Sequence, residues 1–234
     1  MHKFIKGNYG IDAPYVPITF IGISLAFFIL CIIYRSYSYL FVSLFFLINS
    51  LIYLHTSLRG KFYIWNKLIG KYAPENITKS CDIACGRGLA LIQTAIYYPS
   101  AVAEGIDIWN KMDQSGNSPE QTKLNAQKNQ AKNIKIATGN MLKLPYENES
   151  FELVTSSIAI HSLKSSHERN MALSEIYRIT KPGGRIIIVD FKYTKSYAKQ
   201  LNKLSGKEII HKSCGFKGWF GNPLYSNKVL IFEK

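Results

Sequence analysis

The amino-acid sequence predicts an α/β fold in which a doubly wound, mostly parallel sheet of seven strands carries an antiparallel pair at one edge. Two transmembrane helices are expected to precede this domain. Three observations support the prediction. Strand-like and helix-like segments alternate from about residue 79, a glycine-rich turn joins the first of those strands directly to a helix, and two uncharged runs of about 20 residues come before them.

The two uncharged runs cover residues 15–34 and 36–54, and Arg35 separates them. A helix needs about 20 apolar residues to cross the hydrocarbon core of a bilayer, so each run is long enough to span it. The link is very short, which favours a tight antiparallel hairpin. Two alternatives remain open: a pair of helices buried in a soluble core, or a hairpin that is re-entrant or lies in the membrane plane.

Basic residues flank the two outer ends of the hairpin, whereas its tip carries Arg35 alone. Positively charged flanks tend to stay in the cytoplasm. The sequence therefore predicts that both termini and the following domain are cytoplasmic. The flanking residues are Lys3 and Lys6 at one end, and Arg59, Lys61, Lys67 and Lys71 at the other.

The composition also divides the chain in two. The 234 residues have a net charge of +14 and are 47% hydrophobic, which excludes a disordered polar chain. We expect residues 1–58 to form the N-terminal segment and membrane anchor, and residues 59–234 to form a separate basic domain. Cys81 and Cys85 have a spacing that is a poor zinc or disulfide signal, so no metal site is predicted.

The elements of the second part follow from hydrophobic periodicity and capping residues. Ser118 with Pro119, and Ser165 with Glu168, are typical of helix N-termini. The last two strands have no useful helix between them and should pair antiparallel at one edge. The expected order is helix 62–72, strand 79–84, helix 89–98, strand 101–106, helix 119–130, strands 134–138 and 151–158, helix 165–179, strand 185–191, helix 196–204, and strands 208–211 and 228–233.

A glycine-rich turn follows the first strand of this domain. Gly86 and Gly88 let the backbone approach a ligand closely, and the helix that begins there favours a carboxylate or phosphate. Asp107 ends the second strand, 19 residues after Gly88, where an acid can accept hydrogen bonds from both hydroxyls of a ribose. The pattern predicts a nucleoside-binding site at the carboxyl ends of the strands.

Five short motifs, in order over residues 79–191, resemble those of class I S-adenosylmethionine-dependent methyltransferases. They are similar above all to the branch with ubiquinone/menaquinone and sterol methyltransferases. The resemblance implies a Rossmann-like domain, S-adenosyl-L-methionine as cofactor and methyl transfer as the activity. The motifs are DIACGRG at 82–88, EGID at 104–107, GNM at 139–141, LP at 144–145 before FELV at 151–154, and KPGG at 181–184.

The resemblance also implies roles for the residues of the turn. Asp82 would help to anchor the amino group of the methionine part, while Gly86 and Gly88 would form the tight turn beside it. Ala84 stands where the family usually has its first glycine, and its methyl group is expected to loosen cofactor binding. Ser157, near the end of the fourth strand, is a further expected cofactor contact.

For the nucleoside part, the resemblance implies that Asp107 holds the ribose. Ile108 and Trp109 would pack against the adenine, and Asn140 and Met141 would meet its edge. Asn140 replaces the acid usual at this position, which keeps an acceptor but loses the charge.

The acceptor is expected to face the end of the fourth strand. His161 is the candidate base or substrate contact there, although it is equally open to a structural role in its loop. Asp113, Gln114 and Asn117 lie in a polar tract beside the adenosine site and are candidate acceptor contacts or part of a lid. Trp219 belongs to an aromatic tract, residues 215–225, that is a third candidate wall.

Nine lysines and two acids lie between residues 192 and 234. A basic surface suits nucleic acid or an anionic membrane leaflet, or it is simply solvated. The hairpin favours the membrane, and no RNA-binding motif is present, so nucleic acid is not the expected partner. The sequence predicts a membrane-anchored methyltransferase for a small lipophilic acceptor such as a quinone, lipid or isoprenoid. The alternatives are an RNA or protein methyltransferase, and a non-catalytic cofactor-binding membrane scaffold.

Overall fold

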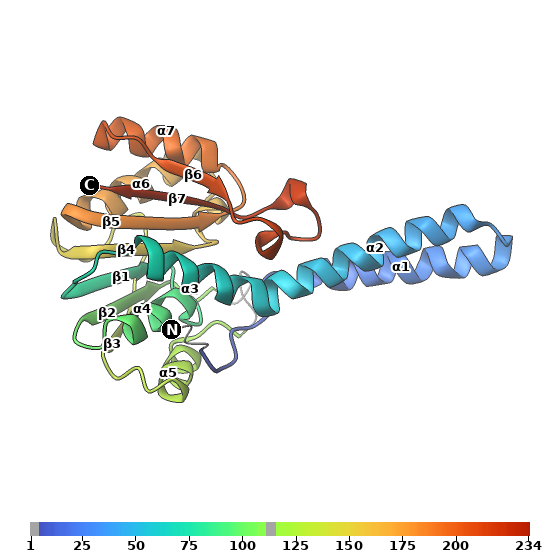
Figure 1. Ribbon diagram of the computed structural model, residues 1–234, viewed down its shortest axis with the longest axis horizontal. Coiled ribbons are helices and arrows are strands. Elements are labelled where there is room, and N and C mark those ends of the chain that lie inside the picture. Colours follow the sequence, from blue (N-terminus) through green and yellow to red (C-terminus); the bar gives the residue numbers. More distant parts are fainter. Residues whose placement is uncertain (1–4, 111–115) are drawn as a thin grey trace.

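Seven strands form one mixed sheet in the order β3-β2-β1-β4-β5-β7-β6 (Figure 1). The computed structural model describes residues 5–110 and 116–234. β1 to β5 run parallel to their neighbours, and β7 pairs antiparallel with both β5 and β6, as predicted for the sheet edge. The strands are β1 Lys79–Ile83, β2 Val102–Asp107, β3 Ile134–Thr138, β4 Phe151–Ser157, β5 Thr180–Asp190, β6 Ile210–Ser213 and β7 Lys228–Glu233.

Helices cover both faces of the sheet, and β5 shows how the sequence produces this arrangement. Successive side chains of a strand point to opposite faces. Ile187 and Val189 pack in one core with α3 and α4, whereas Ile186 and Ile188 pack in the other with α6 and α7. The helices are α3 Lys61–Tyr72, α4 Leu89–Tyr97, α5 Pro119–Lys128, α6 Ser166–Ile179 and α7 Thr194–Ser205.

Both predicted helix caps are present. The Ser118 hydroxyl accepts a hydrogen bond from the Gln121 amide at the start of α5, and Ser165 and Glu168 form a reciprocal capping box at the start of α6. α5 ends at Lys128, two residues earlier than predicted, because Gln130 adopts a left-handed conformation with φ 55°. Five residues earlier than predicted, β5 begins at Thr180, which pairs with Phe151 before the register shifts.

Two long helices, α1 Tyr15–Tyr34 and α2 Tyr37–His55, form a hairpin that projects from the α/β domain (Figure 1). Both are long and apolar enough to cross a membrane, and α1 is mostly exposed, with Pro17 and Ser24 as its buried residues. Large apolar side chains cover the exposed surface of the hairpin, including Ile18, Leu25 and Phe45.

Three buried serines of the hairpin, Ser24, Ser43 and Ser50, point inward between the two helices. The Ser24 hydroxyl donates to the Ser43 carbonyl at 2.9 Å, and the Ser50 hydroxyl donates to the Pro17 carbonyl at 3.1 Å. The hairpin is therefore apolar outside and hydrogen-bonded inside, the reverse of a helix pair on the surface of a soluble protein.

α2 does not stop where the sequence places the domain boundary. A π-helical turn, Thr56–Gly60, joins it to α3 without a break, so that residues 37–72 form one continuous helical rod (Figure 1). The expected boundary between residues 58 and 59 lies inside this rod. Since α3 packs on the sheet, the hairpin is continuous with a helix of the domain core.

Candidate functional site

A cavity of about 880 Å³ opens at the carboxyl ends of the strands. It lies at the point where the strand order reverses, between β1 and β4, which is where open α/β sheets bind their ligands. The connections that follow β1, β2, β3, β4 and β5 all contribute residues to its wall. The glycine-rich turn and the predicted acid at the end of β2 therefore meet in one place.

Three alternate residues of the turn adopt left-handed backbone conformations. Ala84, Gly86 and Gly88 have φ angles of 54°, 52° and 83°. This region is open to glycine but costs an L-amino acid with a Cβ of order 1–2 kcal/mol. Ala84 thus carries backbone strain at the first position of the turn. Ala84 and Gly86 line the cavity, as expected for residues beside a cofactor.

Asp107 connects the end of β2 to this turn. One carboxylate oxygen accepts a hydrogen bond from the Gly86 amide at 2.8 Å, and the other accepts from the Trp109 amide at 2.6 Å. The Asn117 side chain donates to it as well, at 3.3 Å. The carboxylate is nearly buried and lies in the cavity wall, so its position and acceptor chemistry fit the two hydroxyls of a ribose.

The residues expected around the adenine divide into two groups. Ile108, Asn140 and Met141 line the cavity. Trp109 does not: it has φ 61°, and its indole N–H donates to the Thr138 hydroxyl at 2.8 Å. Ile108, an exposed apolar side chain, is the residue left to cover an adenine on this side.

Asp82 lies below the turn and outside the cavity wall. Its carboxylate accepts hydrogen bonds from the Leu91 amide at 3.0 Å and from the Thr155 hydroxyl at 2.7 Å. Burial raises its pKa to about 7. Both oxygens are used inside the protein, joining the first turn of α4 to β4. Asp82 thus supports the turn in this structure, and its contact with the methionine part stays a prediction.

Gly88 is also outside the cavity wall, where a cofactor contact was expected. It caps the N-terminus of α4, and a Cβ at this position would lie 2.8 Å from a methyl group of Thr122. Its role is to let α5 pack closely against the turn.

His161 and Ser157 both reach the cavity from the end of β4. The His161 Nδ1 lies 2.9 Å from an oxygen of the Asp190 carboxylate, and the His161 backbone amide donates to the same carboxylate at 3.0 Å. Ser157 accepts a hydrogen bond from the Trp65 indole at 2.9 Å. Asp190, fully buried at the end of β5, was not predicted, although an acid at a strand end was an available signal.

The predicted acceptor contacts are only partly brought together. Asn117 is buried and lines the cavity, while Asp113 and Gln114 lie outside the described residues. Trp219 lies outside the cavity because its carbonyl accepts a hydrogen bond from Thr56 at 2.5 Å, and this holds it against the root of the hairpin. Its neighbour Phe220 provides the wall instead.

The cavity has a further wall that the sequence did not indicate. Residues 5–13, here called the N-terminal strap, cross between α5 and the root of the hairpin (Figure 1). Near α5, the Arg87 guanidinium donates to the Asn8 side-chain oxygen at 2.6 Å, and the Asn125 side-chain amide donates to the Asn8 backbone carbonyl at 2.9 Å. The strap is therefore attached to the residue that stands between the two glycines of the turn.

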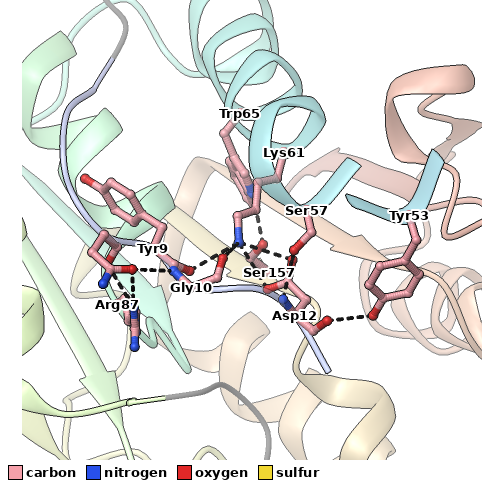
Figure 2. A network of polar contacts seen from close by, with 10 residues as sticks. Tyr9, Gly10, Asp12, Tyr53, Ser57, Lys61, Trp65, Arg87 and Ser157 are labelled. Carbon is pink, nitrogen blue, oxygen red and sulfur yellow. Dashed lines mark hydrogen bonds and ion pairs between the residues drawn. The ribbon is translucent and has the colours of Figure 1, made fainter. Parts of the chain in front are cut away.

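The other end of the strap is attached to the helical rod (Figure 2). The buried Lys61 ammonium donates to the Tyr9 and Gly10 carbonyls and pairs with the Asp12 carboxylate at 3.2 Å. Ser57 exchanges hydrogen bonds with Asp12, and the Tyr53 hydroxyl donates to the Asp12 carbonyl at 2.7 Å. This network links the hairpin to the cofactor side of the cavity through the strap.

Comparisons with known proteins agree with this geometry. Residues 81–188 match the protein family described as "Methyltransferase domain". A ubiquinone/menaquinone biosynthesis C-methyltransferase from Geotalea daltonii is 30% identical over 122 residues, which are 52% of this chain and 48% of that protein. A demethylmenaquinone methyltransferase from Lactococcus lactis subsp. lactis is 30% identical over 131 residues, 55% of this chain and 48% of its own.

The chain thus spans about half the length of the curated relatives it matches. Among solved structures, that of a SAM dependent methyltransferase from Aquifex aeolicus is similar with a TM-score of 0.55 and 14% sequence identity. The similarity covers 71% of this chain and 87% of the other. At this level of identity the likeness establishes the fold.

Proposed function

Because residues 81–188 form an S-adenosylmethionine-dependent methyltransferase domain, we propose that the whole chain is a membrane-anchored enzyme that methylates a small lipophilic acceptor. The acceptor class is a quinone, lipid or isoprenoid-like molecule. One observation carries the proposal: one cavity contains most of the residues expected to hold the cofactor, Asp107 among them, together with the His161 side chain and aromatic residues of the hairpin. The quinone methyltransferases among the relatives support the same class of acceptor.

The hairpin supports membrane anchoring by its length and by the distribution of its side chains. The 20 residues of α1 rise about 30 Å, which matches the hydrocarbon thickness of a bilayer. Its outer surface is apolar, and Ser24, Ser43 and Ser50 form hydrogen bonds between the helices, as polar groups within a bilayer must. A core helix of a soluble protein would be mostly buried, whereas α1 is mostly exposed.

The charge distribution favours a cytoplasmic domain that faces an anionic leaflet. The tip of the hairpin carries Arg35 alone, and Tyr34, Tyr37 and Tyr39 surround it, as in the aromatic belt of a membrane interface. The lysines of residues 192–234 belong to the domain at the other end. Both termini are accordingly assigned to the cytoplasm, and the basic surface to electrostatic contact with lipid headgroups.

The site fits the cofactor by shape and donor chemistry. Ala84 and Gly86 present backbone for the methionine part, while Asp107 offers a carboxylate for the ribose and Ile108 an apolar side chain for the adenine. When bound, the cofactor supplies an electrophilic methyl group on a sulfonium.

The chain's residues position the acceptor and exclude water, which supplies much of the acceleration of an in-line displacement. Held by Ala84, Gly86 and Asp107, the cofactor would supply its methyl group to a carbon or oxygen of the acceptor, and its sulfur would keep the electron pair of the broken carbon–sulfur bond as a neutral thioether. His161 accepts the proton released by the acceptor, and Asp190, 2.9 Å from Nδ1, stabilises the imidazolium that forms.

The test uses the full chain in detergent or vesicles with methyl-labelled S-adenosylmethionine. Three parallel reactions contain a lipid extract of membranes, total RNA or soluble protein as the methyl acceptor. The labelled product is identified by mass spectrometry. We expect label in the lipid extract and its loss in His161→Ala, with calorimetry showing unchanged cofactor affinity. Label in RNA or protein would replace the proposed acceptor. Cofactor binding without turnover on any fraction would favour the non-catalytic scaffold.

A further inference from the structure

The cavity extends beyond His161 along a row of aromatic rings from distant parts of the chain. The His161 and Phe191 rings lie 4.5 Å apart between centroids, and Phe191 and Phe220 lie 5.6 Å apart. Phe220 then contacts Tyr53 of α2 at 5.0 Å. All four side chains belong to the cavity wall. A row of aromatic rings therefore joins the His161 side of the cavity to the hairpin.

Past Tyr53, the cavity is lined by the two hairpin helices. Val16 and Phe20 of α1 and Phe45 and Phe46 of α2 face it, and the Phe20 and Phe46 rings lie 5.9 Å apart. From Tyr53 to Phe45 the helix rises about 12 Å, so the lining continues well along the hairpin. This is the part of the molecule whose outer surface is apolar, with Phe45 itself 58% exposed.

The opposite wall comes from the loop that joins β6 to β7. This loop lies beside the root of the hairpin in Figure 1 and contributes Phe220, Asn222 and Tyr225 to the cavity. The Asn222 side chain donates to the Asn49 side chain of α2 at 3.3 Å. Gly60 touches the Lys217 carbonyl so closely that no side chain fits between them. The loop is thus held against the helical rod.

We propose that this aromatic section is a binding site for the apolar chain of the acceptor, which enters from the bilayer between the hairpin and the β6–β7 loop. The proposal rests on the proposed function and specifies its substrate as an amphiphile with a reacting headgroup and a long apolar chain. The headgroup lies between the cofactor and His161, and the chain lies along Phe191, Phe220 and the hairpin helices. An acceptor without a chain would leave this section unfilled.

The occupant follows from the two ends of the cavity. The inner end carries Asp107, His161 and the other cofactor-side residues, so it receives the reacting headgroup, whereas Asn49 and Asn222 at the outer end are hydrogen-bonded to each other. The outer end is aromatic and runs along helices whose exposed faces are apolar, so it suits a hydrocarbon chain. Because the chain passes from the bilayer to another apolar environment, its affinity is expected to depend on packing against the rings and not on transfer out of water.

The test is photo-crosslinking of the full chain in phosphatidylcholine nanodiscs, which requires no turnover. The probe is a hydroquinone with a twelve-carbon chain that ends in a diazirine, and its adducts are mapped by mass spectrometry. We expect adducts on α1 near Val16 and Phe20, on α2 near Phe46, and on the β6–β7 loop. A phosphatidylcholine with the same diazirine serves as a second probe, and unlabelled dodecyl-hydroquinone serves as its competitor. Labelling of these segments by the lipid probe should fall when dodecyl-hydroquinone is added.

Two tryptophan variants of α1 make the test specific. Val16 lines the cavity, whereas Ile18 is 66% exposed on the outer surface of the same helix. Val16→Trp should lower the adduct yield at least fivefold, and Ile18→Trp should leave it unchanged. Cofactor affinity should be the same in both variants.

The outcomes separate this proposal from the function on which it rests. Adducts scattered over the outer hairpin surface, or equal yields in Val16→Trp and Ile18→Trp, would overturn the chain site even if the protein methylates a soluble ring. Phosphatidylcholine labelling that the hydroquinone does not displace would make the section a structural lipid site, and the proposal would fail. Adducts at the cavity without methyl transfer to any extract would leave the chain site intact and refute the enzyme.

Discussion

Replacing Asp82 by asparagine separates a supporting role from a cofactor-binding role. The carboxylate is buried and accepts hydrogen bonds from the Leu91 amide and the Thr155 hydroxyl. An asparagine can keep both contacts, since its carbonyl accepts from Leu91 and its amide group donates to the Thr155 hydroxyl. The variant therefore removes the ionisable proton with little change in packing.

The magnitude follows from the pKa. Burial raises the pKa of Asp82 from 3.8 to about 7, so the folded protein keeps a proton that the unfolded chain has already lost. The Asp82 carboxyl therefore lowers the free energy of unfolding of the wild type as pH rises from 3.8 to about 7. Asp82→Asn has no ionisable group at this position and does not lose stability in this way. Between about pH 5 and about pH 8 the variant should gain about 2–3 kcal/mol relative to the wild type. For a chain of this size, the Tm of Asp82→Asn minus the Tm of the wild type should therefore increase by roughly 5–10 °C over this pH range.

The assay is thermal unfolding of both proteins in the same detergent across this pH range, with S-adenosylmethionine affinity measured by calorimetry. Glu152→Gln is the control. Burial raises the pKa of Glu152, but hydrogen bonds from Lys181, Lys79 and Thr78 outweigh it and lower the pKa to about 2. Its variant should lose stability by an amount nearly constant over the same range.

Two results would refute the argument for Asp82. A Tm difference between Asp82→Asn and the wild type that does not change with pH would show that the carboxyl ionises normally. A tenfold or greater loss of cofactor affinity would show that the carboxylate contacts the methionine part after all. We expect an affinity within about threefold of the wild type.

Three further variants test other parts of the site. Asp190→Asn should reduce turnover at least about 100-fold through its effect on His161, at unchanged cofactor affinity; turnover within threefold of the wild type would exclude this role. Ala84→Gly should raise stability by about 0.5–1 kcal/mol, because glycine removes the strain of φ 54° at a smaller entropic cost, and a lower Tm would contradict the strain. Lys61→Met should cost about 3 kcal/mol and speed cofactor dissociation by leaving Asp12 unpaired in the strap, whereas adding Asp12→Asn should recover most of the stability. Equal stability of the single and double variants would exclude a contribution of the pair.

Local patterns were sufficient to predict the strands of the sheet, the two helix caps and the glycine turn, because each depends on residues close together in the sequence. The methyltransferase resemblance drawn from five motifs is confirmed at the level of the domain. The joint between the hairpin and the domain was less visible. Residues 56–60 carry no signal for a π-helical turn, so the continuous rod from Tyr37 to Tyr72 was divided into separate elements.

The missed parts of the site depend on contacts between residues far apart in the sequence. The hydrogen bond between the Asn8 carbonyl and Asn125 joins residues that are 117 positions apart, and neither segment has a sequence pattern that predicts it. Asp82 and Trp219 were placed in the site from their motif or tract, but their polar atoms are used by neighbours that only the fold brings close. Sequence patterns identify the backbone positions of the site better than the directions of its side chains.

We infer that the membrane anchor and the methyltransferase domain act together on one substrate that is dissolved in the membrane. The most direct test measures the initial rate of methyl transfer by the full chain in vesicles. The acceptor is the membrane lipid that gives the labelled product. Phosphatidylcholine is added to lower the acceptor's mole fraction in the bilayer while its bulk concentration is held constant. Our account predicts that the rate falls in proportion to the mole fraction of acceptor in the bilayer. A rate that follows the bulk concentration and ignores surface dilution would contradict it.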